Sequence, residues 1–77
     1  FAPRLADLMS LDESAFGARF RGTPITRAKR RGFLRNVAVA LGNWGSPQAL
    51  SALEPALADP EPLIREHAAW AIAQIKS

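Results

Sequence analysis

Residues 33–44 read FLRNVAVALGNW and residues 64–75 read IREHAAWAIAQI, and both stretches have the pattern of an amphipathic helix. Their apolar residues recur at intervals of three and four, which places them on one face of a helix. Ala38 aligns with Ala69, 31 residues further on, and apolar residues align on either side of this pair. The two stretches are therefore interpreted as one structural unit that occurs twice.

Turn residues separate these helices from each other. Gly45-Ser46-Pro47 predicts a turn in which Ser46 caps the next helix and Pro47 occupies its first position. Asp59-Pro60-Glu61-Pro62 is expected to end that helix and to start the last one. This order predicts three consecutive helices, with one helix between the two repeated ones.

The start of the first repeated helix is less regular. Extending its apolar stripe backwards would bring Arg30 onto a buried face, which is unfavourable for a charged group. A break at Gly32 is therefore expected, with a short basic turn at 26–31 and a core helix over 33–42. Gly42 or Asn43 is expected to end that helix.

Two further short helices are predicted before residue 20. Ser10, with Glu13 three residues later, has the form of a capping box that starts the second of them. Phe16 and Phe20 lie one turn apart, and Gly22-Thr23-Pro24 interrupts the helix. No run alternates with the period of a strand, so the fold class is predicted to be all-α with about four to five helices.

The order of helices and turns resembles the short HEAT-like repeat, a two-helix unit of right-handed solenoids. About three such repeats are usually needed for stability, and this chain offers one and a half. Residues 1–25 are therefore expected to form an N-terminal helical cap on the repeat region 26–77, within one compact domain. Because the chain starts with Phe1 and not with Met, its natural N-terminus is expected to be missing, so that it would be part of a longer parent.

Composition excludes several classes of chemistry. The chain has 77 residues, no cysteine and one histidine, so it holds no disulfide, thiolate zinc site, Fe–S ligation or multi-histidine metal site. No apolar run approaches the length of a membrane span, and no signal peptide is visible. His67 is expected to serve packing rather than catalysis. The chain alone is predicted to be catalytically inert.

A basic block is the main functional signal. Residues 19–35 contain seven Lys or Arg residues and no acidic residue, whereas both flanking segments are mildly acidic. Guanidinium groups pair bidentately with phosphates, so the block predicts an anionic partner. The candidate phosphate-binding residues are Arg21, Arg27, Lys29, Arg30, Arg31 and Arg35. Because no aromatic platform is visible, recognition of backbone and shape is expected.

The sequence around this block resembles the C-terminal region of the epoxyqueuosine reductase family. The resemblance rests on FRGTPI at 20–25, RAKR at 27–30, GFLRN at 32–36 and LGN at 41–43. The stretch from Asp59-Pro60 to Ala71, with REHAAWA at 65–71, is also similar to that family.

This resemblance implies a cytoplasmic parent enzyme that reduces epoxyqueuosine to queuosine at the wobble position of tRNA. It implies cobalamin and two [4Fe–4S] clusters as cofactors, all held by an N-terminal catalytic part, with none in this chain. The helical fragment would then position the anticodon arm of tRNA and contact its own catalytic domain, with no role at a membrane.

Two alternatives remain open at the level of sequence. The chain could be a HEAT-like protein-interaction or scaffold module, in which the cations meet an acidic protein. The basic block could also face its own catalytic domain and never contact RNA. Among individual residues, Arg35 and Arg65 could pair with Glu54, Glu61 or Glu66. The two tryptophans are expected to pack in the core or between repeats, with a partner or domain interface as the alternative.

Overall fold

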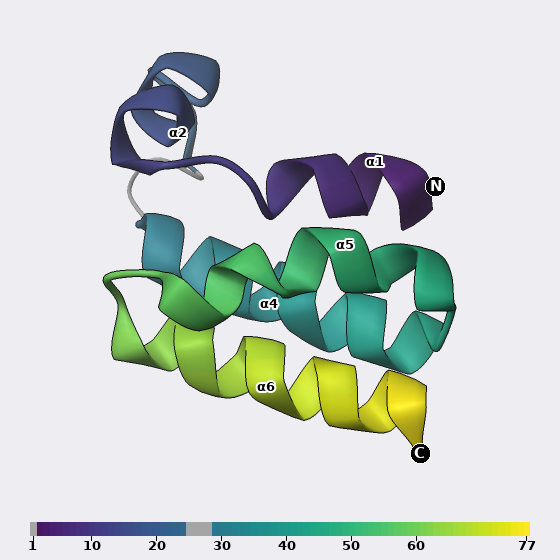
Figure 1. The fold of residues 1–77 in the computed structure, drawn as a ribbon. Helices are drawn as coiled ribbons and strands as arrows, with labels where there is room; N and C mark the ends of the chain where they lie inside the picture. The colour runs from purple at the N-terminus through teal and green to yellow at the C-terminus, as the bar shows by residue number, and fades with distance from the viewer. Residues whose placement is uncertain (1, 25–28) are drawn as a thin grey trace.

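A computed structural model describes residues 2–24 and 29–77, and this part of the chain is helical without a strand (Figure 1). The all-α prediction is therefore confirmed. Five α-helices and two short 3₁₀ helices are described, namely α1 (Ala2–Leu8), α2 (Glu13–Arg19), α4 (Arg30–Trp44), η1 (Pro47–Ala49), α5 (Leu50–Leu53), η2 (Pro55–Ala58) and α6 (Pro62–Lys76).

The two long helices α4 and α6 lie side by side and run in the same direction (Figure 1). The segment η1–α5–η2 returns between the end of α4 and the start of α6, as the turn residues predict. Ser46 caps this segment by accepting a hydrogen bond from the backbone N–H of Gln48. Helix α1 packs on α4 and α5 and covers the remaining side of the core.

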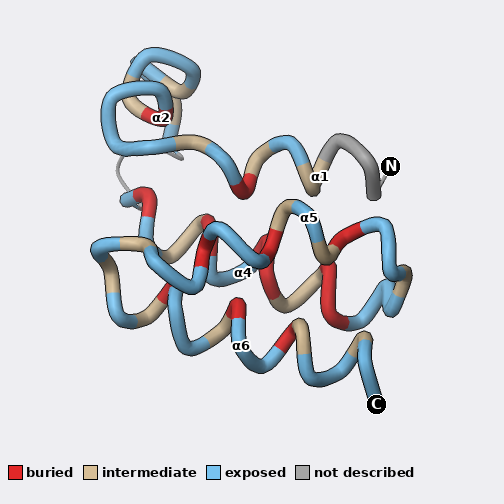
Figure 2. The backbone as a smooth tube through the Cα atoms, viewed as in Figure 1, coloured by how far each residue is buried: buried red, intermediate tan, exposed pale blue. Residues whose placement is uncertain are grey.

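The core lies where these helices meet (Figure 2). Its largest fully buried side chains are those of Leu34, Leu41, Leu53 and Ile64. Burying each of them fully contributes about 1.5–3 kcal/mol relative to exposure. The core thus draws on α4, α5 and α6 together, so that no single helix is independently stable.

The burial pattern corrects the register of the repeat. Leu34 and Ala38 are buried in α4, and Ile64 and Ala68 are buried at the positions 30 residues later in α6. Ala69, the residue expected to match Ala38, is exposed. The structural repeat is therefore 30 residues long, because side-chain burial, and not residue identity, defines equivalent positions.

Helix α4 is longer than the sequence predicts. It continues without a break from Arg30 to Trp44 and ends at Gly45, which has φ +75°. The expected break at Gly32 and the expected end at Gly42 or Asn43 are both wrong. The helix can contain Arg30 because an acidic partner neutralises that residue, as described below.

Gly42 has a packing function in the interior of α4. A methyl group added at Gly42 would lie 2.7 Å from Cζ3 of Trp70 and 3.0 Å from Cα of Ala71. The missing side chain therefore allows α6 to approach α4 closely. In contrast, a methyl group at Gly32 of the same helix would meet no atom within 4 Å.

The N-terminal helices are fixed by caps and aromatic contacts. Asp12, and not Ser10, caps α2, because its carboxylate accepts a hydrogen bond of 2.7 Å from the backbone N–H of Ala15. Ser10 instead donates to the carbonyl of Asp7 at the end of α1. The ring of Phe16 lies 4.9 Å from that of Phe20 and 5.6 Å from that of Phe33. This cluster attaches α2 to α4.

The two tryptophans do not lie in the core. Trp44 and Trp70 each retain 39% of their surface exposed, and Leu57 retains 45%. Trp70 nevertheless packs between the two repeated helices, as expected, because its Cζ3 lies against Gly42 of α4. Alanine and glycine at this contact leave too little depth to enclose the indole of Trp70, which stays at the edge of the seam.

We expect Gly42→Ala to destabilise the domain by about 1–3 kcal/mol, because overpacking at Trp70 and Ala71 outweighs the gain in helix propensity. In the matched variant Gly32→Ala the added methyl group meets no other atom. This variant should stabilise the domain by up to about 1 kcal/mol, because alanine has the higher helix propensity. Chemical denaturation followed by circular dichroism measures both. Equal stabilisation by the two substitutions would contradict the close approach at Gly42.

Candidate nucleic-acid interface

The structure brings three of the candidate cations together along the first part of α4. Lys29 directly precedes the helix, and Arg31 and Arg35 lie one turn apart on it, all three with exposed side chains. Arg21 is also exposed but lies beyond the end of α2, on another segment. Arg27 lies outside the described residues.

The N-terminus of α4 adds to the positive charge of these residues. Lys29 provides no side-chain cap, and the first turn of α4 contains no acidic residue. The unpaired N–H groups and the dipole of a helix both favour anions at such an end. Glu13 and Glu61 line the same hollow of about 190 Å³ as Lys29 and Arg31, and the four side chains form no ion pair with one another. Neither cation is held in an ion pair within the described residues, and Glu13 and Glu61 offset their charge inside the hollow.

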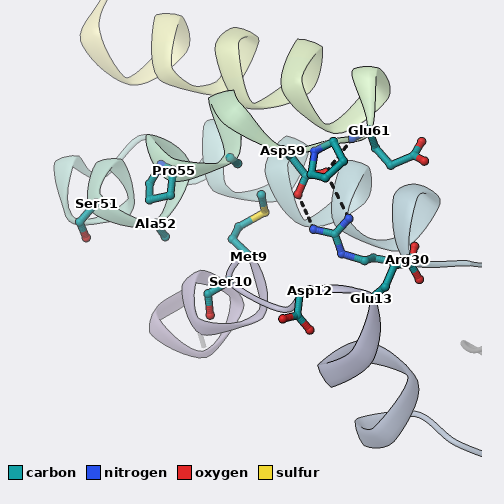
Figure 3. Close-up of a pocket in the computed structure, with 12 residues that line it drawn as sticks. Met9, Ser10, Asp12, Glu13, Arg30, Ser51, Ala52, Pro55, Asp59 and Glu61 are labelled. Atoms are coloured by element: carbon teal, nitrogen blue, oxygen red, sulfur yellow. Dashed lines mark hydrogen bonds and ion pairs between the residues drawn. The ribbon is translucent and has the colours of Figure 1, made fainter.

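Arg30 differs from its neighbours and corrects the prediction. Only 6% of its surface is exposed, and it forms an ion pair with Asp59 in which both terminal guanidinium nitrogens, Nη1 and Nη2, donate hydrogen bonds to the carboxylate (Figure 3). Its Nε donates a hydrogen bond of 2.7 Å to the carbonyl of Leu11. The side chain joins α4 to the turn before α6 and to the loop before α2, so it serves structure and is not offered to a phosphate.

The hollow around this ion pair is acidic (Figure 3). It has a volume of about 500 Å³ and lies between the N-terminal helices and the segment α5–η2. Asp12, Glu13 and Glu61 line it, whereas Arg30 and Asp59 neutralise each other. The hollow therefore repels phosphate, and two of its acidic residues, Glu13 and Glu61, also border the smaller hollow lined by Lys29 and Arg31.

The ion pair changes the ionisation of both partners. The hydrogen bond from Arg30 holds the pKa of Asp59 below its ordinary value, and the backbone N–H of Glu61 adds to this effect. The hydrogen bond to Asp59 correspondingly raises the pKa of Arg30. Both groups stay charged at neutral pH, so each provides the partner that the other needs when buried.

Arg35 lies at the seam between α4 and α6. Its Nε donates to Nε2 of His67 over 3.3 Å, and Nδ1 of His67 lies 2.9 Å from the carbonyl of Leu63. Because Nε2 accepts, Nδ1 carries the ring proton and donates to that carbonyl. Arg65 donates to the carbonyl of Asp59 at 2.7 Å. The predicted pairing of these two arginines with glutamates is thus absent from the described residues.

The described residues offer little other chemistry. They contain no group of three or more His, Cys, Asp or Glu side chains arranged to hold a metal ion. No helix in residues 2–24 and 29–77 has both the length and the apolar character needed to cross a membrane.

Comparisons with known proteins identify relatives of the chain. Residues 25–77 match the HEAT repeats family. The chain is 46% identical over 71 residues to epoxyqueuosine reductase from Xanthomonas campestris, covering 91% of the chain and 20% of that enzyme. It is 44% identical over 75 residues to the epoxyqueuosine reductase from Escherichia coli, covering 95% of the chain and 19% of that enzyme.

The chain thus spans about a fifth of the length of the curated relatives that it matches. No solved structure gives a significant match to the chain.

We expect Arg30→Ala to destabilise the domain by about 3–5 kcal/mol, because it leaves the carboxylate of Asp59 buried without its partner. The neighbouring variant Arg31→Ala should change stability by no more than about 0.5 kcal/mol, because that side chain is exposed. Urea denaturation measures both values. Similar losses for the two variants would contradict the structural role of Arg30.

The ion pair also predicts acid sensitivity. The folded-state pKa of Asp59 lies below the unfolded value of about 3.9, so its stabilising contribution is fully present above about pH 5. That contribution is lost as the pH falls through the folded-state pKa. Thermal denaturation at a series of pH values should show a shallower acid-induced loss of stability for Asp59→Asn than for the wild type. If stability fell with pH equally in Asp59→Asn and the wild type, the ion pair would not be the source of the acid sensitivity.

Proposed function

Because the chain belongs to the HEAT-repeat family and is homologous to a segment of epoxyqueuosine reductases, we propose that it is the tRNA-positioning domain of such an enzyme. The homology carries this proposal, because it covers about nine-tenths of the chain at 41–46% identity. The name of these relatives gives epoxyqueuosine as the substrate, and we propose that a tRNA carries this modified nucleoside and that the domain holds the anticodon arm of that tRNA.

The exposed cations support this role physically. Phosphate contacts provide most of the affinity in nucleic-acid binding, and they position the RNA without reading its sequence. Lys29, Arg31 and Arg35 follow one helix, so their relative positions are set when the domain folds. Arg21 adds a cation from the segment after α2. Such a row of cations suits a phosphate backbone better than a single small anion.

The chemistry of the parent enzyme would lie in its catalytic domain. Fe–S clusters need cysteine thiolates, and this chain contains none, so the two [4Fe–4S] clusters do not fit its residues. Cobalamin would likewise belong to the catalytic part. We propose that this domain contributes binding and orientation of tRNA, that it contacts its own catalytic domain, and that the parent acts in the cytoplasm.

A second function is favoured by a different observation. Trp44 and Leu57 are large apolar side chains that remain exposed at separate points of the surface. Tryptophan is enriched at protein interfaces, so the domain could act as a HEAT-like scaffold or dock on its catalytic domain. Binding of RNA to the chain distinguishes these functions.

We expect the chain to bind a tRNA whose wobble base is a queuosine precursor, with an affinity that falls steeply as salt increases. Replacing Lys29, Arg31 and Arg35 together by Gln should weaken binding and reduce the slope of log affinity against log salt by roughly 2–3. The control Lys76→Gln removes an exposed cation in the last turn of α6 and should leave the slope nearly unchanged.

Circular dichroism checks that each variant remains folded. Absence of binding at low salt by the folded wild type would contradict the proposed function and favour the scaffold.

A further inference from the structure

An apolar hollow lies on the seam between α4 and α6, beyond the end of the basic surface. It has a volume of about 300 Å³ and is lined by Val39 of α4 and by Glu66, His67 and Trp70 of α6. Its lining is thus mainly an indole ring and the methyl groups of Val39. An opening of this shape suits a flat, largely apolar group that enters from solvent.

The indole of Trp70 is held in place from one side. Its Cζ3 occupies the space that a side chain at Gly42 would fill, while 39% of the residue remains exposed. One edge of the ring is therefore packed into the seam, and part of the residue remains open to solvent. Because packing already restricts its rotamers, the ring can receive a stacking partner at a low entropic cost.

A cation lies beside His67, which lines the hollow together with this ring. Arg35 precedes Val39 by one helical turn, and its hydrogen bond to His67 brings it to the rim of the hollow. It uses one N–H for His67 and one for Asn36, each over 3.3 Å, so the other donors of the guanidinium can reach an anion. Glu66 also lines the hollow and disfavours an anion inside it, whereas Arg35 favours an anion beside it.

We propose that this hollow binds an unpaired nucleobase of RNA, which stacks on the indole of Trp70 while an adjoining phosphate contacts Arg35. Bases stack on aromatic side chains in single-stranded recognition, and Arg beside such a ring adds an ionic contact. This inference rests on the proposed function and adds a site for a base to the row of phosphate contacts. An apolar segment of a protein would fill the hollow but would leave the donors of Arg35 without an anion.

The experiment uses tryptophan fluorescence of the chain. In the variant Trp44→Phe the remaining tryptophan is Trp70, so its emission reports the hollow. An anticodon stem-loop RNA with an unpaired loop should quench this emission with saturation, whereas a fully paired RNA duplex of the same length should quench it far less. The reverse variant Trp70→Phe is the matched control, because its remaining tryptophan is Trp44. The emission of Trp44 should change little when the stem-loop is added.

Affinity and its salt dependence provide the second readout. Trp70→Ala should weaken binding of the stem-loop by roughly 5- to 150-fold with the salt slope unchanged, because no phosphate contact is lost. Trp70→Phe should recover most of this loss, because a phenyl ring also stacks. Arg35→Gln should lower the salt slope by about 1.

Three results would overturn the proposal. One is unchanged emission of Trp70 on binding of the stem-loop, and another is equal quenching by the duplex; either would leave the phosphate-binding function intact and assign the hollow to a protein partner. The third is absence of RNA binding by the wild type, which would remove the proposed function together with this site.

Discussion

The ion pair between Arg30 and Asp59 determines how the parts of this small domain are joined. Arg30 begins α4 and pairs with Asp59 in the turn before α6. Its Nε also donates a hydrogen bond to the carbonyl of Leu11, in the loop before α2. Three segments that are distant in sequence thus meet at one side chain. A buried ion pair adds little net stability relative to apolar packing, but the loss of one partner is costly. The ion pair therefore determines how the three segments are arranged, and it adds little to the net stability of the domain.

Much of the fold was predictable, because it follows from local patterns. The apolar stripes of α4 and α6, the cap at Ser46 and the turn at Asp59 all follow from residue type and spacing. The predictions were wrong where a residue distant in the sequence determines the local structure. Arg30 looked incompatible with a buried helix face, because nothing within the helix shows that Asp59 lies beside it. A lone arginine on an apolar stripe could have indicated a buried acidic partner elsewhere in the chain.

The site was predicted less completely than the fold. Charge counting identified the basic block, but it could not separate exposed Lys29 and Arg31 from buried Arg30 between them. It also could not find Trp70, whose exposure depends on how closely α6 approaches Gly42. Residue type alone favours burial of a tryptophan, whereas the distance between two helices determines whether a ring fits between them. Such distances depend on the whole packed structure.

The burial of Arg30 determines when the backbone around it becomes ordered. Because this side chain is anchored on both sides, the backbone between Lys29 and Arg31 is immobilised when the domain folds, before any ligand arrives. A disordered basic tail of the same composition would lose that freedom only on association, which lowers its affinity. Because anchored Arg30 lies between the exposed residues Lys29 and Arg31, the folded domain holds these two cations in a fixed arrangement. Their spacing is therefore set by the protein before a ligand binds.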